Sequence, residues 1–130
     1  MRSNRHYPLI LIADDDPLLV AILRRYLEPI GSEIVSVGDG AAALEFIERE
    51  APDIVILDSM MPGMSGGEVL LRLKAQGLLD RLKVVVLTTL SQEEHVLTAL
   101  RLGAADFIAK PFSPDELVLR VRRQLMTRAA

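Results

Sequence analysis

Five short apolar runs alternate along this chain with longer segments of helical period, and this alternation constrains the fold more than any other feature. The runs are rich in branched side chains and bounded by turn residues, as strands are. They are Leu9–Ala13, Ile34–Val37, Ile54–Leu57, Val84–Thr88 and Phe107–Ala109. Several are continuously apolar, which is expected of strands that are buried on both faces. Strand followed by helix throughout predicts an α/β domain with a parallel sheet.

The helical segments carry their own start and stop residues. The first is expected to begin after Asp16, a natural N-cap, with Pro17 at the first helical position and Gly31 as a stop. Its apolar residues form one stripe of the kind that faces a core: Leu19, Ile22, Leu23, Tyr26 and Leu27. The other helices are expected near Ala41–Arg49, Gly66–Ala75, Glu93–Leu102 and Ser113–Met126, the last with Ser113, Pro114 and Glu116 as cap, first residue and capping-box acid. All connections are short, and right-handed crossovers place helices on both faces, so the expected architecture is a three-layer α/β sandwich.

Length and composition favour a single domain. The chain has 130 residues, 50% of them hydrophobic, which is enough for one substantial core. We expect an N-terminal tail over residues 1–8, the folded domain over 9–126, and a C-terminal tail or the start of a linker over 127–130. No apolar stretch approaches the roughly 20 residues of a membrane span, and the start of the chain is polar. The expectation is therefore a cytoplasmic protein that does not contact a membrane.

Charge and cysteine content exclude further classes. The absence of cysteine rules out disulfides, thiol catalysis and cysteine metal ligands. The net charge of −3 and the pI near 5.4 provide no global attraction for nucleic acid. This segment is not expected to bind DNA itself.

Polar residues follow four of the expected strands. Asp14 and Asp15 come after the first strand, Asp58 after the third, Thr88 ends the fourth, and Lys110 follows the fifth. Because the carboxyl ends of parallel strands meet at one edge of the sheet, these side chains should converge there. Clustered carboxylates repel one another unless a divalent cation lies among them, and an all-oxygen ligand set favours Mg²⁺. A lysine and a hydroxyl beside them suit a phosphoryl group, and a carboxylate nucleophile can form an acyl phosphate.

Four stretches of the chain carry a specific resemblance. LILIADDDP, DIVILDSMMPGMSG, VVVLTT and GAADFIAKPF resemble, in order and in spacing, the signature stretches of the response-regulator receiver family. The resemblance covers roughly Pro8 to Leu125. It implies a flavodoxin-like (βα)5 fold whose parallel, five-stranded sheet has the order 2-1-3-4-5. It also implies a signalling switch rather than an enzyme with a separate substrate, phosphorylated by a sensor histidine kinase or a histidine phosphotransfer protein.

The resemblance assigns roles by position. Asp58 would accept the phosphoryl group. Asp15, Asp58 and the main-chain carbonyl of Met60 would ligate Mg²⁺, with Asp14 at or near the metal through water. Thr88 and Lys110 would contact phosphoryl oxygens. The peptide bond before Pro111 would be cis.

The same resemblance predicts how phosphorylation would be reported. Thr88 would move toward the phosphoryl group and Phe107 would turn inward, shifting the population between two packings. Asp106, Glu116 and Arg120 resemble part of a charged face through which one subfamily forms homodimers, although Ala105 and Val96 replace two of its expected charges. Met60 and Leu90 are apolar where faster-hydrolysing members carry polar side chains, which predicts a long-lived phosphoaspartate.

Alternatives stay open at this point. Asp16 is expected to be an N-cap rather than a metal ligand. Thr89 is the alternative to Thr88 as the hydroxyl that contacts the phosphoryl group. The alternative role for Phe107 is that of a simple core residue. A dehalogenase-type phosphatase also uses Asp, Mg²⁺, Thr and Lys, but it needs a further acidic motif and usually a cap. A phosphorylation-independent receiver-like module is the other alternative.

Overall fold

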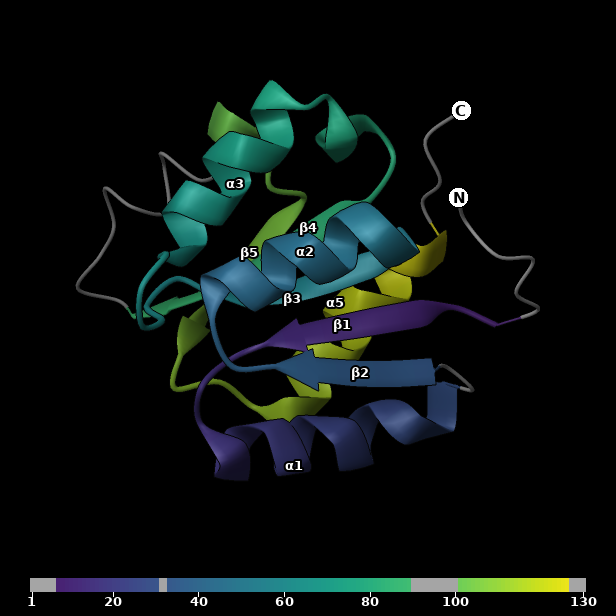
Figure 1. Cartoon of the computed structure of the whole chain (residues 1–130). Coiled ribbons are helices and arrows are strands. Elements are labelled where there is room, and N and C mark those ends of the chain that lie inside the picture. Colours follow the sequence, from purple (N-terminus) through teal and green to yellow (C-terminus); the bar gives the residue numbers. More distant parts are fainter. Residues whose placement is uncertain (1–6, 31–32, 90–100, 127–130) are drawn as a thin grey trace.

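Five parallel strands form one sheet in the computed structural model, which describes residues 7–30, 33–89 and 101–126. The strands are β1 (Leu9–Ala13), β2 (Glu33–Val37), β3 (Ile54–Asp58), β4 (Lys83–Thr89) and β5 (Asp106–Lys110). Their order across the sheet is β2-β1-β3-β4-β5. The predicted fold class and strand order are therefore confirmed, and all the arrowheads end at the same edge of the sheet (Figure 1).

Helices cover both faces of the sheet. They are α1 (Pro17–Leu27), α2 (Gly40–Glu50), α3 (Gly66–Ala75) and α5 (Pro114–Met126), with 3₁₀ turns at Glu28–Ile30 and Leu78–Asp80. Most of the helix expected over Glu93–Leu102 lies outside the described residues, although Arg101 and Leu102 are helical. None of the described helices has the length and apolar character needed to span a bilayer.

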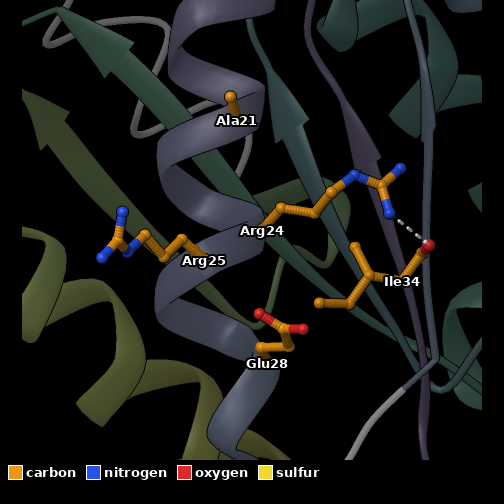
Figure 2. A pocket seen from close by; sticks show the side chains of 5 residues that line it. All are labelled: Ala21, Arg24, Arg25, Glu28 and Ile34. Carbon is orange, nitrogen blue, oxygen red and sulfur yellow. Dashed lines mark hydrogen bonds between the residues drawn. The ribbon is translucent and has the colours of Figure 1, made fainter.

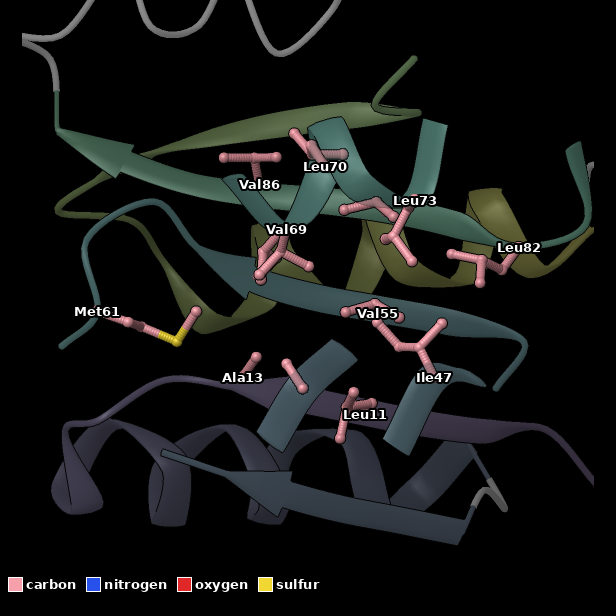
Figure 3. Packing of buried hydrophobic residues seen from close by; sticks show 13 residues of the cluster. Leu11, Ala13, Ile47, Val55, Met61, Val69, Leu70, Leu73, Leu82 and Val86 are labelled. Carbon is pink, nitrogen blue, oxygen red and sulfur yellow. The ribbon is translucent and has the colours of Figure 1, made fainter. Parts of the chain in front are cut away.

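The strands are apolar throughout because both of their faces are buried. Successive side chains of a strand point to opposite faces of the sheet. One set, including Leu11 and Val55, packs with α2 and α3 in a cluster that Figure 3 shows from close by, here called the α2/α3 core. The alternate set, including Ile10 and Ile56, packs with α1 and α5. The sheet is thus the middle layer of three (Figure 1).

Helix α1 starts where the sequence predicts, but fewer of its apolar residues are buried than the predicted core-facing stripe contains. The Asp16 side chain accepts the Leu18 and Leu19 amides at 3.0 and 3.3 Å, so its N-cap role is confirmed. Leu23 and Leu27 are buried, whereas Ile22 is 36% and Tyr26 42% exposed. The core-facing prediction was wrong for these last two because the helix turns Leu23 and Leu27 toward the sheet. The predicted stop, Gly31, lies outside the described residues.

The loop between β3 and α3 is shaped by local polar contacts. Gly63 has a φ of 74°, a conformation that glycine adopts without strain. Ser65 caps α3, and the Ser65 and Glu68 side chains accept each other's backbone amides in a capping box. The loop therefore leaves the end of β3 and enters α3 along a defined path.

Candidate functional site

Strand register brings the acidic residues together. Ala13 of β1 pairs with Leu57 of β3, so the next residues, Asp14 and Asp58, lie side by side at the carboxyl edge. Carboxylate oxygens of Asp14, Asp15 and Asp58 all lie within 4.8 Å of one another. Asp14 and Asp58 are buried, at 3% and 5% exposure, while Asp15 is exposed. The cluster is therefore a small acidic cleft with one side open to solvent.

Lys110 supplies a positive charge to the same cleft. It ends β5, the edge strand of the sheet, and precedes a cis peptide bond to Pro111. Its Nζ lies 3.3 Å from Asp58 Oδ1 and 3.7 Å from Asp14 Oδ2. One lysine thus faces two buried carboxylates.

The Asp14 carboxylate is only partly satisfied. Its Oδ1 accepts the Asp16 amide at 2.9 Å, but its Oδ2 is buried without a hydrogen-bond partner, since Lys110 approaches only to ion-pair distance. Burial raises the pKa of the Asp14 carboxyl, and the neighbouring Asp58 charge acts in the same direction. A buried, underpaired carboxylate oxygen beside two other carboxylates is the arrangement that a divalent cation relieves.

The donor set fits a hard cation. Asp14, Asp15 and Asp58 offer carboxylate oxygens only, which suits Mg²⁺ better than a nitrogen- or sulfur-seeking metal. The three carboxylates that the sequence singled out for a metal are thus brought together in one place and could hold it.

The remaining predicted site residues surround Asp58. The Met60 amide donates to Asp58 Oδ1 at 3.2 Å, and the Met60 side chain is 59% exposed. Thr88 is buried near the end of β4. Val86 pairs with Phe107 across β4 and β5, so Thr88 and Phe107 belong to the same face of the sheet. Phe107 is half-buried and packs against the α2/α3 core.

Of the three residues expected at a dimer face, Arg120 contacts both of the others within the chain. Arg120 of α5 donates to Asp106 at 2.8 Å, to the Phe107 carbonyl at 3.3 Å and to Glu116 at 3.4 Å. Asp106 also accepts the Phe107 amide at 2.8 Å. This group ties α5 to β5, a contact that sequence spacing alone does not indicate.

A separate pocket lies between α1 and β2. It has a volume of about 420 Å³ and is lined by Ala21, Arg24, Arg25, Glu28 and Ile34 (Figure 2). Arg24 crosses it to donate to the Ile34 carbonyl at 2.9 Å and to Ser36 Oγ at 3.1 Å. None of its lining residues belongs to the acidic cleft.

The fold and the cleft define a class: a doubly wound α/β domain with an acidic cluster and a lysine at the carboxyl edge of its sheet. Residues 10–122 match the family described as the response regulator receiver domain. The DNA-binding response regulator MtrA of Mycolicibacterium smegmatis is 40% identical over 116 residues, covering 89% of this chain and 50% of MtrA.

Solved structures agree with the sequence comparison. The receiver domain of the Francisella response regulator 1452 has a TM-score of 0.84 at 32% identity, covering 92% of this chain and 97% of that one. The BeF3-activated DrrB receiver domain has a TM-score of 0.82 at 31% identity, covering 93% and 99%.

This chain belongs to the response regulator receiver domain family. It is a receiver domain of a two-component response regulator, a signalling domain whose general function is phosphorylation on aspartate. Response regulators receive their phosphoryl groups from histidine kinases, and receiver domains bind Mg²⁺ through an acidic pocket. The chain spans about half the length of the curated relatives it matches.

Proposed function

We propose that Asp58 accepts the phosphoryl group, in a reaction that depends on Mg²⁺ held by Asp14, Asp15 and Asp58. The observation that carries the proposal is the convergence of these three carboxylates within 4.8 Å, with Lys110 Nζ 3.3 Å from Asp58. Asp58 is the member of the cluster that both this lysine and the Met60 amide contact through Oδ1. These contacts leave the second oxygen, Oδ2, as the candidate nucleophile.

In the proposed step an Asp58 carboxylate oxygen forms a bond to phosphorus. The bond between that phosphorus and the imidazole nitrogen of the donor phosphohistidine breaks, and its electron pair stays on the nitrogen. No proton has to be removed from the nucleophile, because a carboxylate attacks in its ionised form. Asp58 therefore needs orientation more than activation, and the Met60 amide at 3.2 Å provides a fixed reference for it.

Lys110 and Thr88 would stabilise the transferred group. Lys110 already faces Asp58 and retains access to solvent, with 28% of its side chain exposed, so it can shift from the carboxylate to a phosphoryl oxygen. The Thr88 hydroxyl, on a neighbouring strand end, would donate to another oxygen. The cation, when bound, neutralises charge on the carboxylates and the peripheral phosphoryl oxygens.

Intact-protein mass after incubation with acetyl phosphate and Mg²⁺ tests this proposal. We expect a gain of one phosphoryl group that is lost in Asp58→Asn and in the presence of a chelator. No gain in the parent chain would instead support a phosphorylation-independent module. Transfer to Asp58→Asn would place the acceptor elsewhere.

Phosphorylation would be reported through Thr88 and Phe107. Both lie on the α2/α3 side of the sheet, and Arg120 ties the Phe107 carbonyl to α5. We propose that this route alters the surface of β5 and α5, including Asp106, Glu116 and Arg120, and promotes a homodimer. Sedimentation with and without beryllofluoride tests it: a monomer in both conditions would remove the dimer proposal.

The output of the full-length protein is proposed from its relatives. MtrA is named a DNA-binding response regulator, and this chain covers 50% of it. We propose that a DNA-binding domain accompanies this receiver domain, which itself has a net charge of −3. The coding sequence on either side of this segment will test that proposal directly.

A further inference from the structure

Gly40 lies outside the acidic cleft and contacts the β3–α3 loop, which in turn contacts Asp58. Gly40 is the first residue of α2 and is buried. A Cβ at this position would overlap the Met64 carbonyl oxygen and would lie 2.8 Å from Met64 Cβ. The start of α2 therefore rests directly against the backbone of the β3–α3 loop, at a distance that only glycine permits.

That loop leads back to the proposed phosphoryl acceptor. The Met60 amide donates to Asp58 Oδ1, so the loop, together with Lys110, orients that carboxylate. Met61 points into the α2/α3 core from the same loop (Figure 3), and Met64 is half-buried beside it. A shift at Met64 would therefore be transmitted along a short, packed segment to Met60.

The far end of the loop is fixed in the same way. Gly66, the first residue of α3, has no Cβ and so fits against the backbone of β3, where a Cβ would overlap the Asp58 carbonyl oxygen and lie 2.9 Å from Ser59 Cα. Its amide donates to the Ser59 carbonyl at 3.2 Å. With this end pinned to β3, any displacement of the loop by a side chain at position 40 is confined to residues 59–65.

We propose that Gly40 is a positioning residue for the Mg²⁺ and phosphoryl site, acting through Met64 and the β3–α3 loop on Met60 and Asp58. The inference rests on the proposed function and adds α2 to the elements that determine it. A methyl group at position 40 should move the loop, turn Asp58 away from Asp14 and Asp15, and weaken metal binding. Changes to the groups that orient metal ligands typically cost about 10- to 100-fold in affinity.

The chain offers a matched control. Gly38 lies two residues earlier in the same β2–α2 connection, is exposed, and has nothing within 4 Å of its ideal Cβ position. Gly38→Ala therefore adds the same methyl group nearby without touching the loop. Calorimetric titration of Mg²⁺ and the rate of phosphorylation by acetyl phosphate should be measured on the parent, Gly38→Ala and Gly40→Ala, with circular dichroism to establish folding.

We expect Gly40→Ala to bind Mg²⁺ about tenfold more weakly or worse and to be phosphorylated correspondingly slowly, while Gly38→Ala stays within about twofold of the parent. A folded Gly40→Ala with the parent's Mg²⁺ affinity would overturn the inference, even if its melting temperature fell. A parent chain that binds no Mg²⁺ would instead overturn the proposed function.

A measurement on the parent chain covers the case in which Gly40→Ala does not fold. Amide hydrogen exchange with and without Mg²⁺ should show slowing at the first turn of α2, residues 40–43, together with the loop residues 59–65. Slowing confined to the loop would mean that α2 does not sense the site, and the inference would fail.

Discussion

Lys110 and Asp58 meet across two strand ends that are 52 residues apart, with Nζ 3.3 Å from Oδ1. The lysine also lies 3.7 Å from Asp14 Oδ2, so it is shared between two buried carboxylates. Under the proposed function, a lysine in this position would have two tasks. It would offset carboxylate repulsion before the metal binds, and it would be available to a phosphoryl oxygen afterwards.

Lys110→Met should separate these two tasks. We expect phosphorylation by acetyl phosphate to slow by about 10²-fold, the usual effect of removing one donor to a developing oxyanion. Mg²⁺ affinity should be retained or increased, because a positive charge leaves the cleft. Lys83→Met is the control and should keep the parent's rate, because Lys83 is the first residue of β4 and lies at the edge of the sheet opposite the acidic cleft. A Lys110→Met protein phosphorylated at the parent's rate would contradict the assignment.

Asp14→Asn should stabilise the protein when no metal is present. The Asp14 carboxylate has a buried Oδ2 without a hydrogen-bond partner, and an amide in its place keeps the acceptor for the Asp16 amide while removing the charge. We expect urea unfolding in chelator to show a gain of about 1–3 kcal/mol. Asp15→Asn should gain less, because Asp15 is exposed. Added Mg²⁺ should stabilise the parent and fail to stabilise Asp14→Asn to the same extent.

Most of this site was predictable from sequence because strand order fixes which side chains share an edge. Asp14, Asp58 and Lys110 each follow an apolar run, and a parallel sheet leaves their relative placement little freedom. The close approach of Gly40 to Met64 was not predictable, because it depends on how the start of α2 packs against a loop that lies beyond β3 in the sequence. The sequence shows that position 40 is a glycine but not which part of the chain packs against it.

The exposure of Ile22 and Tyr26 has a related cause. Helical periodicity places them beside Leu23 and Leu27, and the sequence cannot say how far the helix is rotated about its axis. The contact of Arg120 with Asp106 could likewise not be predicted, since the sequence identifies both residues as charged but not whether they pair within one chain or between two.

Gly66→Ala and Gly67→Ala should differ sharply although the residues are neighbours. A Cβ on Gly66 would overlap the Asp58 carbonyl oxygen, whereas one on Gly67 meets only Ser65 Oγ at 3.8 Å. We expect Gly66→Ala to cost at least about 2 kcal/mol in urea unfolding, since the β3 backbone has to move. Gly67→Ala should gain up to about 1 kcal/mol, because alanine is the better helix former. Equal effects would mean that the end of β3 tolerates the extra methyl group.

Arg120→Met should loosen α5 from β5. The change leaves the half-buried Asp106 carboxylate without its 2.8 Å partner and removes the donor to the Phe107 carbonyl. We expect a loss of about 1–3 kcal/mol in urea unfolding. Arg122→Met, on the exposed side of the same helix, should change stability by less than about 0.5 kcal/mol. If both variants unfold alike, the contacts of Arg120 add nothing to stability beyond those of a surface arginine.

The lifetime of the phosphoaspartate should depend on Met60. Its side chain is 59% exposed and its amide contacts Asp58 Oδ1, so the residue at this position lies next to the proposed phosphoryl acceptor and is accessible to water. A thioether cannot hold a water molecule in line for attack, whereas an amide can. Met60→Asn should therefore shorten the lifetime several-fold. The decay is measured by intact-protein mass after the phosphodonor is removed. The phosphorylated form of Met60→Leu, whose side chain is apolar and of similar size, should decay at the parent's rate. If it decays as fast as that of Met60→Asn, the polarity of the side chain does not set the lifetime.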